Sequence, residues 1–373
     1  MSVNHLLKTG LGRMDETLEA RGLWPDVESP WVRWAMTELA RHQFAPAVVW
    51  FWDGRTWVAV DRTAQPGRWA DLVYPEPEES TVTQVTDGLA TSSLSCVSVV
   101  ADMLDSLTLE PGHRVLDLGT GAGWNAALLA HRTGPDGQVV SVEADPALAA
   151  AAARRLERAG LDVDVRTGDG TDGAPDAGPY DRLIATYAVE TVPWRWIEQV
   201  RPGGRLVVPW GRMGHFALTV AEDGQSASGW LQGLGLFMKD RNATEAVPAQ
   251  HAVTPNGGAA ATNEELFDDL LDAHALFALR VSHPHIVVTV DRRGAAPCAE
   301  LRDAADRSVR AERGDGDLVS LSGDAQDLWS ALRHGHQLWC ERGRPPLWDY
   351  GMTVTRQTQT VWAGSESTGP YAR

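Results

Sequence analysis

The sequence predicts an α/β fold, a doubly wound and mostly parallel sheet, with an additional α+β domain at the carboxyl end. Between about residues 80 and 240, apolar runs of strand length alternate with runs of helical periodicity, as in a parallel sheet covered on both faces. The stretch VLDLGTGAGWNAALLA at 115–130 predicts a strand, a tight glycine turn and a helix. Residues 241–262 are rich in Ala, Pro, Gly and Thr, which predicts a linker before a carboxyl-terminal domain at 263–373.

The amino-terminal part, residues 1–79, is predicted to be a helical and hairpin segment. Residues 15–44 favour two helices broken around Pro25 and Ser29-Pro30. Residues 47–61 favour two strands around the turn pair Asp53-Gly54, and 63–80 is interpreted as a proline-rich connector.

In the main domain, residues 80–240, strand and helix patterns follow one another in regular order. Helices are expected at 95–107, 124–132, 146–160 and 194–200, and strands at 114–119, 138–144, 163–168, 180–186 and 204–211. Residues 215–224 and 229–240 are expected to form an antiparallel pair at the end of the sheet. Beyond the linker we expect helices at 263–277 and 324–343, and strands at 285–291, near 299–321 and at 351–364.

Composition and charge exclude several classes of partner. The formal charge of −17, without a Lys/Arg block, disfavours nucleic acid. No apolar stretch is long enough to cross a bilayer and the amino terminus is too polar for a signal peptide, so we expect a cytoplasmic protein without membrane contact. The three cysteines, Cys96, Cys298 and Cys340, are far apart, which predicts reduced thiols.

The glycine turn after the strand at 114–119 is the strongest candidate for a cofactor site. Dinucleotide-binding turns have the spacing G-x-G-x-x-G, whereas here single residues separate the glycines. Asp117 lies inside the preceding strand, where it would repel a phosphate but suits the ammonium or sulfonium end of S-adenosylmethionine. The cofactor-binding candidates in this turn are Gly119, Thr120, Gly121 and Gly123. An NAD-dependent oxidoreductase is disfavoured by the glycine spacing.

Two further acids stand at the ends of the next two predicted strands. Glu143 is placed to accept hydrogen bonds from ribose hydroxyls, and Asp169, followed by Gly170, to accept one from an adenine amino group. Each acid taken singly is equally well explained as a solvated loop residue. The ordered set of Asp117, Glu143 and Asp169 favours a methyl-donor site with S-adenosylmethionine as cofactor.

The order of motifs resembles the protein-L-isoaspartate (D-aspartate) O-methyltransferase family. The segments that carry the resemblance are VLDLGTGAGW, VVSVEAD, GDG, PYDRLIAT and VPWRWIEQVRPGGRLVVPWG, preceded by helices that lead to Arg41-x-x-Phe44. It covers about residues 15–240 and excludes the last third of the chain. It implies a class I, Rossmann-like S-adenosylmethionine-dependent methyltransferase domain at 80–240. Residues 263–373 lie outside the resemblance and are predicted to be a substrate-recognition domain, with a dimerisation surface as the alternative.

The resemblance places Ser95 on the active-site serine of the family, although Cys96 and Val97 stand where the family has Gln and Pro. An acceptor carboxylate is already ionised near pH 7, so no strong base is needed. Ser95 can donate its hydroxyl to that carboxylate, and nothing suggests that it acts as a nucleophile. Thr83, Gln84 and Asp87 precede it in a polar segment, where they contact the peptide substrate or form a solvated loop.

The length of the chain points to the methyltransferases of ribosomal-peptide maturation systems, which serve graspetides, lanthipeptides and lasso peptides. This resemblance implies methylation of an Asp or isoAsp side chain in a modified peptide, with the methyl ester closing to an aspartimide (succinimide). The alternatives are repair of isoaspartyl residues in damaged proteins, and a non-catalytic peptide-binding scaffold, which the loss of Gln-Pro after Ser95 would suit. The sequence makes no prediction of oligomeric state.

Histidines in the last third raise the question of a metal. His283 and His285 flank Pro284, and His334, His336 and Cys340 lie on a predicted helix. Metal ligation needs three or four converging ligands, and neither set has the usual zinc spacing. We therefore expect no metal.

Overall fold

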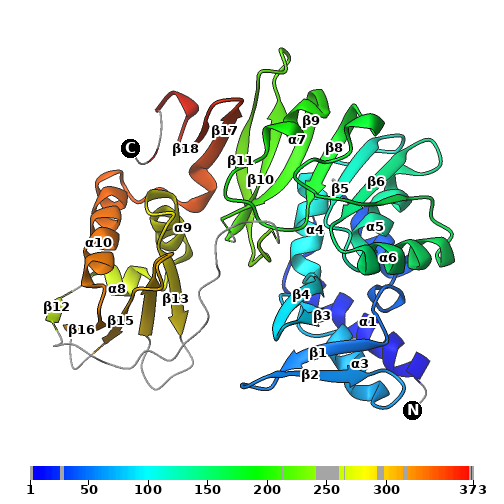
Figure 1. Cartoon of the computed structure of the whole chain (residues 1–373), viewed down its shortest axis with the longest axis horizontal. Helices are drawn as coiled ribbons and strands as arrows, with labels where there is room; N and C mark the ends of the chain where they lie inside the picture. The colour runs from blue at the N-terminus through cyan, green and yellow to red at the C-terminus, as the bar shows by residue number, and fades with distance from the viewer. Residues whose placement is uncertain are drawn as a thin grey trace. The chain divides into compact units, whose positions relative to one another are not determined.

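The chain divides into two units in the computed structural model. The first comprises Met1–Asp240 and Val354–Gln359, and the second Arg241–Thr353 and Thr360–Arg373 (Figure 1). The residues that the structure describes are 3–25, 29–211, 213–240, 260–263, 265–291, 298–313, 318–368 and 371. Most of the expected linker, 241–259, lies outside them, and its last residues belong to a strand, β12 (Ala260–Asn263).

The first unit has a central sheet whose parallel strands run in the order β7-β6-β5-β8-β9. These strands are β5 (Arg114–Leu118), β6 (Gln138–Glu143), β7 (Asp164–Thr167), β8 (Tyr180–Ala185) and β9 (Val200–Trp210). Two antiparallel strands, β10 (Gly214–Val220) and β11 (Ser226–Leu234), continue the sheet beyond β9. The α/β class and the antiparallel pair are therefore as predicted. Because parallel strands end at the same edge, the segments that follow β5, β6 and β7 meet there.

The first unit contains seven helices within its described residues, of which α5, α6 and α7 connect strands of this sheet. They are α1 (Val3–Ala20), α2 (Trp31–Glu38), α3 (Pro66–Val73), α4 (Val97–Ser106), α5 (Trp124–Thr133), α6 (Pro146–Arg158) and α7 (Trp194–Glu198), with short 3-10 turns η1 (Arg41–Gln43) and η2 (Pro175–Ala177). The start of α6 is fixed locally, because the Asp145 side chain accepts hydrogen bonds from the first helical N–H groups and Pro146 presets the backbone. The connector at 63–80 was predicted without a helix, which is wrong: α3 lies within it, and its Trp69, Ala70 and Val73 are buried.

A second, four-stranded sheet precedes α4, with the order β2-β1-β3-β4. Its strands are β1 (Val48–Trp52), β2 (Trp57–Asp61), β3 (Thr81–Thr86) and β4 (Leu89–Leu94). The predicted hairpin around Asp53-Gly54 is confirmed, since β1 and β2 pair antiparallel up to Trp52 and Trp57. The polar segment before Ser95 is the β3–β4 hairpin rather than a loop.

One hydrophobic core joins the amino-terminal elements to the sheet. Leu18, Val32, Phe44 and Trp69 are fully buried in the same cluster as residues of α4, α5 and β5. Burial of side chains of this size stabilises by about 2–3 kcal/mol each. A boundary at residue 79 remains a prediction, and both sides of it pack into this single core.

The second unit is an antiparallel sheet with helices. The sheet has the order β12-β16-β15-β14-β13, with β13 (Val287–Asp291), β14 (Cys298–Arg302), β15 (Ser308–Arg313) and β16 (Leu318–Gly323). The helices are α8 (Glu265–Asp269), α9 (Ala273–Ser282) and α10 (Gln326–Glu341), and 3-10 turns are η3 (Leu347–Asp349) and η4 (Glu366–Thr368). Trp329 and Leu332 of α10 pack on Leu301 and Val309 of the sheet.

Two predictions in this unit are corrected. The helix expected at 263–277 is split into α8 and α9, because the Asp272 side chain accepts hydrogen bonds from the N–H groups of His274 and Ala275 and so starts a new helix. The strand expected at 351–364 is likewise two strands, β17 (Tyr350–Thr355) and β18 (Gln359–Ala363). No helix in the described part of the chain combines the length and apolarity needed to cross a membrane.

Candidate functional site

The turn between β5 and α5 has a backbone that only glycine adopts easily. Gly119, Gly121 and Gly123 have φ of +95°, +53° and +91°, in the left-handed region. A Cβ at Gly119 would lie 2.5 Å from the Thr186 hydroxyl oxygen and 3.0 Å from Cδ1 of Tyr187. The turn is therefore a narrow backbone surface at the carboxyl edge of the sheet, and a side chain there would close it.

Asp117 lies under this turn and is fully buried. Ser141 donates its hydroxyl to Oδ2 at 2.6 Å, and Asn125 donates its amide to Oδ1 at 2.8 Å. The Ser141 hydroxyl also lies 2.6 Å from that of Thr120. Burial raises the pKa of Asp117 to about 6, against the opposing effect of its two donors. Asp117 thus braces the glycine turn from within the protein, and its predicted attraction for a cationic cofactor group stays a prediction.

Glu143, at the end of β6, joins the glycine turn to the start of α6. Its Oε2 accepts a hydrogen bond of 2.8 Å from the Gly121 N–H, and its Oε1 accepts one of 3.0 Å from the Asp145 N–H. The carboxylate is almost fully buried. Since each carboxylate oxygen has two acceptor positions, Glu143 can hold these N–H groups and still accept from ribose hydroxyls.

Asp169 and Gly170 follow β7 at the same edge. The Asp169 carboxylate is exposed and accepts a 2.8 Å hydrogen bond from the Thr171 N–H, while the Gly170 carbonyl accepts one of 2.8 Å from the Trp196 indole. The structure thus places the predicted strand-end acids at the ends of three neighbouring strands. The positive-φ glycine turn and the carboxylates of Glu143 and Asp169 fit a nucleoside cofactor, because a narrow backbone surface and acceptor oxygens lie at one edge of the sheet.

Tyr187 is a residue of this edge that the sequence analysis missed. A Cβ built on Gly170 would lie against the Tyr187 hydroxyl, and a Cβ built on Gly119 would lie against the Tyr187 ring. Burial raises the pKa of the Tyr187 phenol, and the charges of Asp240, Asp169 and Glu143 raise it further. The phenol therefore spans the cofactor candidates. Tyr187 closely follows the end of β8, the next strand of the sheet. This position is the sequence signal that could have identified it.

Ser95 occupies the short link between β4 and α4. Among the residues that the structure describes, none forms a hydrogen bond with its hydroxyl, which is partly exposed. Its carbonyl oxygen accepts a 2.6 Å hydrogen bond from Nη1 of Arg41, and the Leu94 carbonyl accepts one of 2.9 Å from Nη2. The backbone at Ser95 is thus fixed, and a role of its hydroxyl toward a ligand stays a prediction.

Arg41 is almost fully buried behind Ser95. Its guanidinium also donates to the Thr81 hydroxyl at 2.9 Å and lies 5.5 Å from the centre of the Trp124 ring. Burial lowers the pKa of Arg41 to about 10, which still leaves it charged at neutral pH. No carboxylate is paired with it in the ranges that the structure covers. A positive charge therefore stands behind the predicted active-site serine, a feature that the family motif at 41–44 did not reveal.

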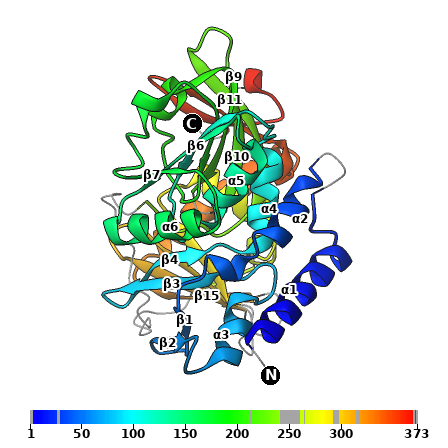
Figure 2. The ribbon, with the colours of Figure 1, turned by 90° about the vertical axis from the view of Figure 1, so that its right-hand side faces the viewer.

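The three predicted substrate residues lie in the β3–β4 hairpin. The Thr83 hydroxyl is buried without a hydrogen bond, and Asp87 has φ of +51° in the hairpin turn. Gln84 donates to Oδ2 of Asp145 at 2.8 Å and accepts from the Thr91 hydroxyl at 2.9 Å. Figure 2 shows this hairpin beside α6, which Asp145 begins. Gln84 therefore braces the hairpin against the cofactor side, and substrate contact by the three residues stays a prediction.

The acceptor and cofactor elements meet at the end of β4. A Cβ on Gly121 would lie 3.6 Å from the Ser92 hydroxyl and 3.9 Å from the Ser93 carbonyl oxygen. Ser95 follows only a few residues later in the chain. The first unit therefore brings the predicted serine to the same region as the predicted cofactor turn.

Comparison with known proteins places the chain in a family. The family model "Protein-L-isoaspartate(D-aspartate) O-methyltransferase (PCMT)" matches residues 69–230. A protein-L-isoaspartate O-methyltransferase of Methanopyrus kandleri is 35% identical over 201 residues, which cover 53% of this chain and 76% of the relative. One of Pyrococcus horikoshii is 45% identical over 123 residues, or 33% of this chain, and the matched part is about half of that relative, 55%.

A solved protein-L-isoaspartate O-methyltransferase has a similar fold over more of the chain than the sequence resemblance covers. It aligns with 95% of this chain and 100% of its own, with a TM-score of 0.54 and 20% identity. The sequence motifs of the family end near residue 240, but the similarity of the fold continues beyond that residue. With the Methanopyrus relative matched over most of its length, the chain belongs to the protein-L-isoaspartate O-methyltransferase family of S-adenosylmethionine-dependent enzymes.

Proposed function

We propose that this enzyme methylates the free carboxylate of an isoaspartyl residue in a peptide or protein. The names of its relatives support this acceptor, and so does the charge around Ser95. A carboxylate reaching Ser95 would meet a free hydroxyl, the amino-terminal end of α4 and the buried Arg41 charge behind it. All three favour an anionic acceptor, and this is the observation that carries the proposal.

On the cofactor side, the backbone of the Gly119–Gly123 turn would hold S-adenosylmethionine, with Glu143 toward the ribose and Asp169 and Gly170 toward the adenine. When bound, the cofactor supplies an electrophilic methyl group on its sulfonium. The protein does not need to remove a proton, because the acceptor carboxylate is already ionised near neutral pH. Its task is alignment, which can contribute several kcal/mol to rate acceleration.

Ser95 has the central role on the acceptor side. Its hydroxyl donates a hydrogen bond to one carboxylate oxygen and leaves the other directed at the methyl group. Arg41 holds the Ser95 carbonyl, so the hydroxyl keeps its place without moving the backbone. The methyl ester that forms is a better electrophile than the carboxylate, so the neighbouring backbone amide nitrogen attacks the ester carbonyl carbon. The ester C–O bond breaks, methanol leaves with the amide proton, and a succinimide forms without further help from the enzyme.

The test is methyl transfer from labelled cofactor to a short linear isoAsp peptide, with the matching Asp peptide beside it. We expect a base-labile ester on the isoAsp peptide alone. Ser95→Ala should lower kcat/KM by roughly 10–100-fold, because one hydrogen bond to a charged group is lost, while the Kd of the cofactor stays the same. Ser98→Ala is the matched control, since Ser98 is near Ser95 in the chain, at the start of α4, and its hydroxyl donates a hydrogen bond to the Pro77 carbonyl instead.

Absence of ester on every isoAsp peptide would overturn the proposal. Methylation of a constrained, maturation-modified Asp peptide and not of the linear isoAsp peptide would instead favour the peptide-tailoring function. The sequence feature behind that alternative is Cys96-Val97, where the family has Gln-Pro. Cofactor binding without any methyl transfer would favour the scaffold.

A further inference from the structure

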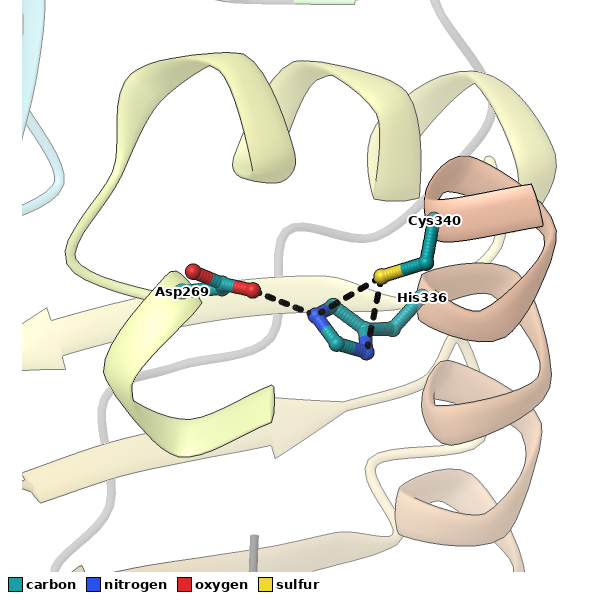
Figure 3. A group of neighbouring side chains, drawn as sticks. All are labelled: Asp269, His336 and Cys340. Atoms are coloured by element: carbon teal, nitrogen blue, oxygen red, sulfur yellow. Dashed lines mark hydrogen bonds and ion pairs between the residues drawn. The ribbon is translucent and has the colours of Figure 1, made fainter. Parts of the chain in front are cut away.

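Three side chains of metal-ligating types meet in the second unit. Asp269 is the last residue of α8, and His336 and Cys340 lie one turn apart on α10. One ligand atom from each lies within 4.8 Å of the others (Figure 3). The imidazole is buried and the other two are partly buried. All three residues belong to the second unit, whereas the candidate methyl-transfer residues belong to the first.

The helix geometry explains how the group forms. Residues four apart on an α-helix lie on the same face, so His336 and Cys340 point to the same side of α10. The third ligand comes from 67 residues earlier in the chain, which is why spacing within the helix predicted no metal.

The distances separate a metal site from a catalytic triad. Oδ2 of Asp269 lies 2.6 Å from Nε2 of His336, and Sγ of Cys340 lies 3.8 Å from the same nitrogen and 4.0 Å from Nδ1. In a triad the carboxylate and the nucleophile would bind different ring nitrogens. Here Sγ lies almost equally far from the two ring nitrogens, so the sulfur is not bound at the nitrogen opposite the carboxylate, and one ligand atom of each residue lies within 4.8 Å of the others.

We propose that Asp269, His336 and Cys340 bind one Zn²⁺, with water at the fourth position. Thiolate, imidazole and carboxylate are the ligand types of zinc, and three protein ligands with one open position form a known class of zinc site. Zinc–ligand distances of about 2.0–2.3 Å in a tetrahedron put neighbouring ligand atoms roughly 3.3–3.6 Å apart. The Nε2–Sγ distance is near this value, and zinc would replace the proton shared by Nε2 and Oδ2, which then separate slightly.

The side chain of Arg344 already places a positive charge beside these three residues. Nη2 of Arg344 is 3.7 Å from Oδ2 of Asp269, and its charge interacts with Cys340. Arg344 is also paired with Glu265 and is nearly half exposed, so it can turn outward when zinc binds. The zinc ion then joins α8 to α10 at the point where Asp269 ends α8.

The test is metal titration of the full chain freed of metal by a chelator. We expect one Zn²⁺ per chain, and with Co²⁺ a thiolate-to-cobalt charge-transfer band together with intense tetrahedral visible bands. Cys340→Ser and His336→Ala should each weaken Co²⁺ binding at least about tenfold, and Cys340→Ser should remove the charge-transfer band. His334→Ala on the same helix and Cys298→Ala are matched controls that should bind as the wild type does.

Two results would overturn the proposal. One is a wild-type cobalt spectrum without a charge-transfer band, and the other is equal binding by wild type and Cys340→Ser. Circular dichroism checks that each variant is folded. If His336→Ala does not fold, Asp269→Asn takes its place, since it keeps the shape of the side chain and should still lower the affinity.

Discussion

The two halves of the candidate methyl-transfer site are held in place in different ways. The cofactor half follows directly from three strand ends, and its contacts join neighbouring segments such as Gly121 and Glu143, 22 residues apart. The acceptor half depends on Arg41, which is 54 residues from the Ser95 carbonyl that it binds. The first can therefore be recognised from local sequence, whereas the second exists only when the amino-terminal elements have packed. Substitutions can separate the two halves.

The largest effect is expected in the cofactor half, from Gly119→Ala. The new Cβ would meet Thr186 at 2.5 Å, and the φ of +95° is strained for alanine. Conformational strain of this kind costs about 1–3 kcal/mol, so we expect roughly 100-fold weaker cofactor binding by calorimetry. Gly67→Ala is the control, because no atom lies near its Cβ position. Unchanged cofactor affinity in Gly119→Ala would mean that this turn does not hold the cofactor.

The next effect is expected in the acceptor half, from Arg41→Met. The variant loses the bonds to the Leu94 and Ser95 carbonyls and the charge behind the serine. We expect kcat/KM for an isoAsp peptide to fall by about 10–50-fold, as a mispositioned group does, with the cofactor Kd within about twofold of wild type. Arg21→Met, which removes a surface ion pair with Glu76 and Glu78, should leave both unchanged. If kcat/KM and the affinity for the cofactor fell by the same factor, the acceptor half and the cofactor half would not be separable.

The same contrast explains what the sequence could predict. The strands at β5, β6 and β8 and the glycine turn are local patterns, in which buried apolar runs and positive-φ glycines lie next to each other in the chain. Arg41 was visible only as part of a family motif, because its role depends on a guanidinium meeting carbonyls from β4. Asp269 was missed for the same reason: its partners are on α10. The position of Tyr187 after β8 is a local signal, whereas its contacts near Gly119 and Gly170 depend on how the strand ends come together.

A pH dependence tests a second support of the acceptor half. The carboxyl-terminal part of α4 lies against His215, which is fully buried and has Ser106 at 3.4 Å and Asp102 at 3.8 Å. Burial lowers the pKa of His215 to about 4. A histidine with a lowered pKa contributes stability above its ordinary pKa, and that stability is lost as the pH falls from about 6.5 toward 4.

We therefore expect wild type to lose about 1 kcal/mol more stability than His215→Gln between pH 7 and 5.5, measured by urea unfolding. Burial, with the charge of Asp105, raises the pKa of Asp102 to about 6, so its contribution has the opposite sign and is lost as the pH rises. Asp102 is present in both proteins, so the difference between them reports His215 together with its 3.8 Å pairing to Asp102. Parallel pH profiles for the two proteins would exclude His215 as a pH-sensitive support of α4.

The smallest effect is expected from Gln84, which lies where the acceptor half contacts the cofactor half. Its amide bonds to Asp145, whose N–H in turn bonds to Glu143 of the cofactor half. Gln84→Ala removes one partly exposed hydrogen bond, worth about 0.5–1.5 kcal/mol. We expect the cofactor Kd to rise only twofold or threefold, and any tightening of cofactor binding by a bound isoAsp peptide to become smaller, because the hairpin no longer transmits its position to α6. Thr86→Ala, at the exposed end of the same hairpin, is the control for local loosening. If Gln84→Ala changes peptide affinity and leaves the effect of peptide on the cofactor Kd intact, Gln84 acts on the acceptor alone, as the sequence first predicted.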